Sequence, residues 1–318
     1  MELKNRIGYA CINMELAKEG VTTNRDIRLA TMQKENSMDI LSAKALANVQ
    51  GLKRIVEWNA EKGIKFYRMS SNIFPWWSKY KFTDLKDWDQ IKECLEYVGK
   101  FARDNDQRLS FHPSHFVVLG SKNPKTRWNA RVSLERHSEM LDIMGFEPSH
   151  WNKLNIHIGS AQGGKEQMMK DWATSFKKLS PNCQARIVVE NDDKANMYSV
   201  QDLYDGIYKN IGVPITFDTF HHEVGAQGGL TKHEAANLAA STWPKGMFVI
   251  HHSSSKRLYE QADARYNQHA SYIYDTIEDF GTNAWIMVES KAKERAILGY
   301  LNNGPMEPMI QERTLDEC

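Results

Sequence analysis

Eight short apolar runs recur along the chain, and they constrain its fold more than any other feature. They occupy residues 6–11, 64–70, 108–112, 153–157, 185–190, 214–218, 246–251 and 284–289. Each run is apolar almost throughout, which is typical of parallel strands that are buried on both faces of a sheet. Longer helix-like segments separate the runs, at 38–61, 88–104, 130–144, 167–179, 200–208, 232–240, 269–280 and 291–301.

Eight strand–helix units in one chain predict an α/β fold, a single (β/α)8 TIM barrel. We expect the barrel domain to span residues 1–301 and residues 302–318 to form a polar C-terminal tail. A doubly wound open sheet is the alternative. It is disfavoured because no GxGxxG motif follows the first run.

Composition excludes several classes of protein. Hydrophobic residues make up 41% of the 318 residues and charged residues 25%, close to globular averages, so the chain is neither disordered nor fibrous. The four cysteines form no CxxC pair, which excludes a zinc finger and suits a reducing compartment. No apolar run is long enough to cross a bilayer, and the start lacks the apolar core of a signal peptide, so we expect a cytoplasmic protein without a membrane partner. The net charge of +1 neither indicates nor excludes binding to nucleic acid, because a local basic patch can bind nucleic acid in a neutral protein.

Six consecutive predicted strands, the third to the eighth, end in a histidine or a carboxylate. Catalytic residues of such barrels lie at the C-terminal ends of the strands. A ring of imidazoles and carboxylates there is what a cluster of divalent ions needs. Two such ions can activate water and stabilise the leaving oxygen of a phosphodiester. The residues are His112, His157, Glu190, Asp218, His251 and Glu289, with His221 three positions after Asp218.

Each of these residues alone has a simpler interpretation. A single strand-end histidine is more often hydrogen-bonded than metal-bound, Asp218 could cap the next helix, and Glu190 could pair with Arg68. These interpretations would have to hold independently at six positions that face one barrel mouth, so the joint pattern predicts a site for several metal ions. His137 and His150 are interpreted as surface or packing residues.

The chain also resembles the UV-damage endonucleases, which are metal-dependent barrels related to AP endonucleases of the endonuclease IV type. The resemblance extends over about residues 6–295 in the family's order, and the RMSSNIFP and VESKAKE segments are its most specific parts. Its motifs are RIGYACIN (6–13), NVQGLKRIVEWNAEKGIKFYRMSSNIFP (48–75), FHPSHFVVLGS (111–121), LNIHIGSAQGGK (154–165), VVEND (188–192), TFDTFHHEV (216–224), IHHSSS (250–255) and WIMVESKAKE (285–294).

The resemblance implies a role for each matching residue. Glu190 would be the carboxylate that bridges the ions and the central catalytic residue. One ion would bind His112 and His157 with Glu190, and a second would bind Asp218, His251 and Glu289 with it. A third site would hold His221, with His269 as its partner. The chain departs from the family pattern at two positions: Val249 replaces a lysine that can be carboxylated to bind metal, and Lys79 stands where a histidine is frequent, so we expect it to be catalytic.

The expected substrate is double-stranded damaged DNA. The resemblance places Tyr9 and Asn13 near the damaged strand, and His115 and Phe116 match a Gln–Tyr pair that enters the duplex at the lesion. We expect Arg68, Lys165 and Lys291 to contact phosphates.

The sequence thus predicts a DNA-repair endonuclease that cuts immediately 5′ to UV photoproducts and leaves a 3′-hydroxyl. We expect two or three divalent ions per chain, with Mn²⁺ first and Zn²⁺ or Mg²⁺ as alternatives. We also expect a monomer that associates with the nucleoid when acting. Three alternatives stay open: an AP endonuclease of the endonuclease IV type, a metal-dependent sugar isomerase on the same barrel, and an inactive DNA-binding module.

Overall fold

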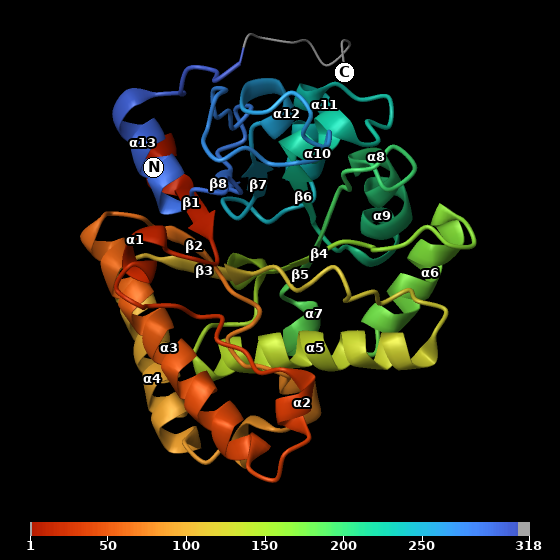
Figure 1. The fold of residues 1–318 in the computed structure, drawn as a ribbon. Coiled ribbons are helices and arrows are strands. Elements are labelled where there is room, and N and C mark those ends of the chain that lie inside the picture. Colours follow the sequence, from red (N-terminus) through yellow and green to blue (C-terminus); the bar gives the residue numbers. More distant parts are fainter. Residues whose placement is uncertain (1, 311–318) are drawn as a thin grey trace.

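The computed structural model describes residues 2–310, and eight parallel strands close into one barrel at its centre (Figure 1). Each strand pairs with the next along the chain and β8 closes on β1, which confirms the predicted (β/α)8 fold. The strands are β1 (Ile7–Ala10), β2 (Phe66–Met69), β3 (Arg108–Phe111), β4 (Leu154–Ile156), β5 (Ile187–Glu190), β6 (Ile215–Asp218), β7 (Val249–His252) and β8 (Trp285–Val288).

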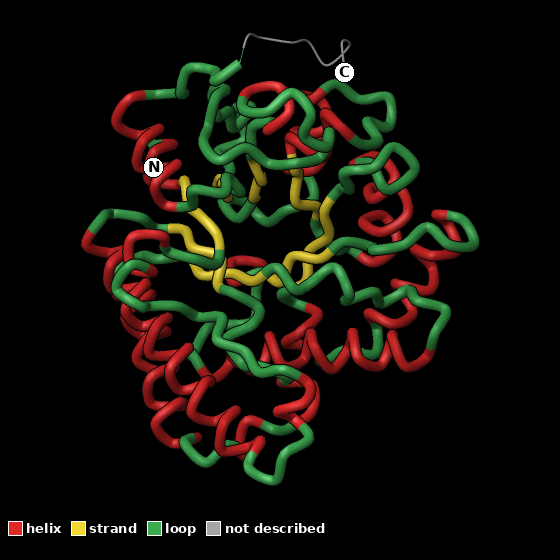
Figure 2. Tube along the Cα trace, viewed as in Figure 1, coloured by secondary structure: helices red, strands yellow, loops and turns green. Residues whose placement is uncertain are grey.

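Helices surround this barrel, so the apolar strands are buried on their outer face as well (Figure 2). The helices with nine or more residues are α3 (Ser37–Glu61), α4 (Trp88–Asp104), α5 (Pro124–Ile143), α6 (Lys165–Phe176), α11 (Lys232–Ala240) and α13 (Glu294–Asn303). The shorter ones are α1 (Met14–Ala17), α2 (Leu29–Met32), α7 (Pro181–Gln184), α8 (Val200–Leu203), α9 (Lys209–Ile211), α10 (Thr219–Val224) and α12 (Lys256–Tyr259). A π-helical segment, Tyr204–Tyr208, joins α8 to α9, and the 3-10 turns are Leu3–Arg6, Trp77–Lys79, Phe82–Asp84 and His150–Asn152.

The strand register sets the ends of neighbouring strands side by side. Asp218 lies opposite His251 in the pairing of β6 with β7, and Glu190 lies opposite Thr216 in the pairing of β5 with β6. The strand-end residues that the sequence singles out therefore gather at one mouth of the barrel.

The other mouth is plugged by side chains. Arg108, the first residue of β3, is fully buried and donates to the carbonyl oxygens of Trp151 at 2.7 Å and Met247 at 2.9 Å. Arg108 therefore helps to close this mouth of the barrel. The first two strands also approach each other closely at Gly8 in β1, where a Cβ would overlap the carbonyl oxygen of Phe66 in β2.

The prediction of a helix at residues 269–280 is wrong. The connection from β7 to β8 contains the short helix α12, and 269–280 has no helix. Backbone groups in this segment bond to other loops instead: Ala270 N–H donates to Ser254 O at 2.9 Å, and Lys291 N–H donates to Ala270 O at 3.0 Å. The segment is thereby held in an irregular conformation that carries His269.

Helix α5 starts earlier than the predicted residue 130. Asn123 caps it, since its side chain accepts from the backbone N–H of Lys125 at 2.9 Å, and Pro124 occupies the first helical position. At the other end of the chain, α13 ends at Asn303. Beyond it, the backbone N–H of Met306 donates to Ile273 O at 2.8 Å, and the last part of the predicted tail, 311–318, lies outside the described residues. Among residues 2–310, every helix is too short or too polar to cross a membrane.

Candidate active site

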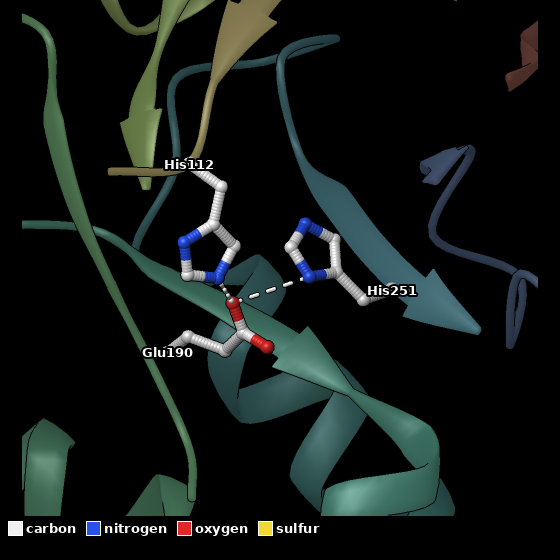
Figure 3. Close-up of side chains that lie close together, drawn as sticks. All are labelled: His112, Glu190 and His251. Atoms are coloured by element: carbon white, nitrogen blue, oxygen red, sulfur yellow. Dashed lines mark ion pairs between the residues drawn. The ribbon is translucent and has the colours of Figure 1, made fainter. Parts of the chain in front are cut away.

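Glu190 is the centre of the cluster at the barrel mouth. It is the last residue of β5 and is fully buried. Its Oε2 lies 3.2 Å from His112 Nε2 and 3.1 Å from His251 Nδ1, so that one carboxylate oxygen faces two rings from different strands (Figure 3). Its Oε1 lies 3.4 Å from His221 Nδ1 and 3.9 Å from His157 Nε2. The two oxygens of one carboxylate therefore face two separate pairs of histidines.

Three groups of side chains in the described chain have the spacing of a metal site. In each, one ligand atom per residue lies within 4.8 Å of the others: His112, Glu190 and His251; His157, Glu190 and His221; and Asp218, His251 and Glu289. All the residues that the resemblance gives to the first two ions belong to this cluster. In these groups His112 lies with His251, whereas the resemblance pairs it with His157; the ring centroids of His112 and His157 are 5.3 Å apart, and the expected assignment stays a prediction.

Several buried polar atoms in the cluster lack a hydrogen-bond partner. Among them are Asp218 Oδ2, Glu190 Oε1 and His269 Nδ1. Asp218 performs its capping role through the other oxygen, since Oδ1 accepts from the backbone N–H of His221 at 2.7 Å. Buried polar atoms without partners are costly, and divalent cations would satisfy these carboxylate oxygens and imidazole nitrogens. The donor set thus fits metal ions.

Burial and mutual charge shift the pKa values of the cluster in opposite directions. Burial lowers the pKa of His251 to about 3 and that of His269 to about 4. Burial would also lower the pKa of His157, but the carboxylates of Glu190 and Asp192 overcome this and raise it to about 10. Burial raises the pKa of Asp218 to about 7, with added repulsion from Glu190 and Glu289. Without metal, the cluster therefore holds protons near neutral pH.

His269 approaches the cluster from the loop that replaces the predicted helix. Its Nδ1 lies 3.8 Å from Glu289 Oε2, and its ring centroid is 6.2 Å from that of His221. Arg68 also reaches Glu289, with which it forms a close, partly buried ion pair, and not Glu190 as one interpretation of the sequence had it. His269 and His221 thus come near each other, as their expected partnership requires.

Sequence reasoning missed Lys153 and Asn155. Lys153 lies directly before β4 and is 1% exposed, and its Nζ is 2.6 Å from Asn155 Oδ1, 3.3 Å from Thr216 Oγ1 and 3.1 Å from His251 Nε2. Asn155 in turn donates a close hydrogen bond to Glu190 Oε2. The signal available in the sequence was a lysine at the start of an otherwise apolar strand.

Asp192 was missed as well, although it lies within the VVEND motif. Its Oδ1 is 3.2 Å from His157 Nδ1, while Nε2 of that ring points towards Glu190. A carboxylate on the second nitrogen of a ligand histidine fixes the orientation of the ring. His222 and His252, by contrast, belong elsewhere: the ring of His222 packs against Phe217, and His252 lines a different cavity.

A cavity of about 750 Å³ opens above the cluster. Its lining includes Arg68, His115 and, from the cluster, His112, His157, His221 and Glu289. Phe116, next to His115, is 75% exposed, and the two ring centroids are 4.1 Å apart. A pair of protruding rings therefore stands at the rim of the cavity.

The structure offers less support for the other residues that were expected to act on DNA. Tyr9 and Asn13 are buried, and Asn13 donates to the Tyr9 hydroxyl at 2.9 Å, so they present no surface to a duplex as placed. Lys165 forms an ion pair with Asp202 at 2.8 Å. Lys79 is exposed in a 3-10 turn and does not line the cavity above the cluster. Its catalytic role stays a prediction, as do the DNA contacts of Tyr9, Asn13 and Lys165.

The remaining histidines that the sequence set aside are packing residues. His137 is buried, its ring centroid lies 4.1 Å from that of Trp77, and its Nδ1 is 2.7 Å from Ser133 O. His150 packs against Trp243.

Comparison of the sequence with known proteins identifies one family. The family model described as UV-endonuclease UvdE matches residues 5–311. The UV DNA damage endonuclease of Clostridium perfringens is 28% identical over 305 residues, which cover 94% of this chain and 70% of that protein. The crystal structure of SacUVDE superposes with a TM-score of 0.79 at 30% identity, covering 93% of this chain and 96% of that one. Endonuclease IV from Thermus thermophilus, with a TM-score of 0.57 and 13% identity over 80% of this chain and 93% of that one, shares the fold.

Proposed function

Because the chain belongs to the UV-endonuclease UvdE family, we propose that it is a DNA-repair endonuclease that cuts the backbone of double-stranded DNA on the 5′ side of UV photoproducts. The observation that carries this proposal is the placement of Glu190, with one oxygen towards His112 and His251 and the other towards His157 and His221. A shared carboxylate of this kind suits two neighbouring divalent ions. It lies beneath an open cavity of about 750 Å³.

Different ligand side chains would form the sites of the individual ions. His112 and His251 would hold one ion with Glu190, and His157 and His221 a second. Asp218 and Glu289 would complete the set with His251, and His269 would join His221 at a third, weaker site. Bound ions would activate water and stabilise the oxygen that leaves the phosphodiester. Mn²⁺ is the first candidate because carboxylate oxygens form a large share of the ligands, and Zn²⁺ or Mg²⁺ are the alternatives.

The protein's own residues would position the substrate. Arg68 lines the cavity and pairs with Glu289, and we expect its guanidinium to contact a phosphate there. His115 and Phe116 would enter the duplex beside the lesion. A photoproduct weakens base stacking and pairing, so opening the helix there costs less than at intact base pairs, by a few kcal/mol at most.

One assay tests both the substrate and the metal. Protein treated with EDTA is assayed for nicking of irradiated and unirradiated plasmid, before and after adding Mn²⁺, Zn²⁺ or Mg²⁺. We expect nicking of irradiated plasmid alone, and only with metal. Equal activity on a duplex with one abasic site would favour an AP endonuclease, and metal binding without cutting of any DNA would favour a sugar isomerase or a binding module.

The variant Glu190→Gln tests the centre of the site. Removing the charge that two ions share weakens both sites, so we expect nicking to fall by at least about a thousandfold while the fold persists. Circular dichroism checks the fold. Activity within a few-fold of wild type would contradict the shared-carboxylate assignment.

A further inference from the structure

A second cavity lies beside the one above the metal-site residues. It has a volume of about 290 Å³ and is formed by the irregular connection from β7 to β8 and the start of the segment after β8. Arg265 and Asn267 line both cavities, so the two adjoin. We call this second cavity the basic pocket; its lining is Lys256, Arg265, Asn267, Gln268, His269, Ser271 and Lys291.

The charged side chains that line the basic pocket all have the same sign. Three of its seven residues, Lys256, Arg265 and Lys291, are cationic, and no carboxylate lines it. None of the three forms an ion pair or a side-chain hydrogen bond with any residue in 2–310. The nearby Glu260 forms no ion pair with them; its carboxylate accepts from the Ser271 backbone N–H at 2.5 Å and from the Tyr274 hydroxyl at 3.1 Å.

Many other surface lysines contrast with these three. Lys100, Lys170 and Lys209 each pair with a carboxylate four residues away on their own helix or turn, at 2.5–2.7 Å. Unpaired cations that converge on one concavity repel one another, so the arrangement costs free energy unless an anion occupies it.

The backbone holds the basic pocket in shape without a ligand. Lys256 N–H donates to Gln268 O at 2.9 Å, Lys291 N–H donates to Ala270 O at 3.0 Å, and Ser255 bridges to His269. These bonds tie together the three segments that carry the cations. An anion would therefore meet preplaced charges, and little conformational entropy would be lost on binding.

We propose that the basic pocket binds a backbone phosphate of the DNA strand, next to the phosphate that is cut. Lys256, Arg265 and Lys291 supply charge, and the Gln268 amide supplies a donor that has no partner among the described residues. His269 connects the two places, since it lines the basic pocket and its Nδ1 lies 3.8 Å from Glu289 Oε2 in the metal cluster. This inference rests on the proposed function, because it requires a DNA strand across the barrel mouth.

The test uses the double variant Lys256→Ala/Arg265→Ala. Fluorescence anisotropy measures the binding of a duplex, with and without one cyclobutane dimer, over a range of NaCl concentrations. We expect Kd to rise about tenfold for both duplexes, and the slope of log K against log salt to become shallower by about 0.9, the value for one phosphate contact. The matched control is Arg131→Ala/Lys178→Ala, which removes two cations from a separate cavity beside α5 and should change neither value.

A second measurement needs no DNA. At constant ionic strength, inorganic phosphate should raise the Tm of the wild type and the control variant, because a ligand that binds only the folded state stabilises it, and the effect should be lost in the double variant. If the wild type fails to cut irradiated DNA but this phosphate effect is still lost in the double variant, the proposed function is wrong and the anion pocket stands. The pocket assignment is overturned if the double variant matches the control in Kd, salt slope and phosphate effect, or if binding weakens only for the damaged duplex.

Discussion

Lys153→Met is the most informative single substitution in the metal site, because it removes a buried amine that touches no substrate. Its Nζ lies 3.1 Å from His251 Nε2 and 2.6 Å from Asn155 Oδ1, and Asn155 bonds to Glu190. Lys153 thus positions a ligand ring and, through Asn155, the shared carboxylate. Methionine is unbranched and only one heavy atom shorter than lysine, so it fills most of the same space and removes these bonds.

The expected loss falls on metal affinity rather than on the fold. Removing the partner that orients a metal ligand typically weakens metal binding by about 10–100-fold, or roughly 1.4–2.7 kcal/mol. Burial is also the main cause that lowers the pKa of Lys153 well below its usual value, so removal of this buried amine should in itself stabilise the folded state. This gain offsets the cost of leaving His251 Nε2 and Asn155 Oδ1 without partners, about 1–3 kcal/mol each. We therefore expect the free energy of unfolding without metal to change by less than about 3 kcal/mol.

Two measurements separate these effects. Competition with a fluorescent chelator gives the affinity for Mn²⁺, and urea unfolding in EDTA gives the stability. Lys65→Met serves as a control, because Lys65 precedes β2, is partly exposed, and pairs only with Asp106 at 3.3 Å. Wild-type affinity for Mn²⁺ in the folded Lys153→Met variant would refute the positioning role.

Three further predictions address protons, the lesion and the third ion. Because the pKa of His157 is raised to about 10, binding of Mn²⁺ at pH 8 should release about one proton, and the affinity should increase as pH rises. Calorimetry in two buffers of different ionisation enthalpy measures the number of protons released. The absence of proton release would contradict the assignment of His157 as a ligand. His115→Ala/Phe116→Ala should lose most nicking of a dimer in a paired duplex and recover part of it when the dimer faces mismatched bases; equal losses on both substrates, or lost metal, would assign these residues to the fold or the metals. Elemental analysis of His269→Ala should show that the weakest ion is lost and that two ions remain; an unchanged ion count would contradict this expectation. Added bicarbonate should not change the activity of the protein, because Val249 cannot be carboxylated, and activation by bicarbonate would contradict that expectation.

The barrel and most of the metal site could be predicted because both depend on short-range patterns in the sequence. Strands buried on both faces must be apolar, so their ends are visible wherever a His, Asp or Glu interrupts the run. The parallel register then brings those ends together, as the pairing of Asp218 with His251 shows. Neither step needs knowledge of side-chain conformation.

The parts that sequence analysis missed depend on contacts between distant segments. Residues 269–280 have a helix-like composition, but backbone bonds to residues 254 and 291 and the Glu260 carboxylate hold this segment in another conformation. The partner of Arg68 and the grouping of His112 with His251 depend on side-chain directions across the barrel, which no spacing along the chain specifies. Lys153 was overlooked because a lysine at a strand start is usually solvated.

The charge balance at the mouth would favour the binding of cations by this cluster. Two buried carboxylates, Glu190 and Asp218, lie with the half-buried carboxylate of Glu289, and the guanidinium of Arg68 pairs with Glu289. The metal-free protein compensates with protons, since the pKa of Asp218 rises to about 7 and that of His157 to about 10. For Asp218 the folded state has the higher pKa, so it favours the protonated form and loses stability as pH rises from about 4 through 7. Divalent ions bound as proposed would replace these protons at the same atoms, so the stabilisation that they bring to the fold should grow over that pH range.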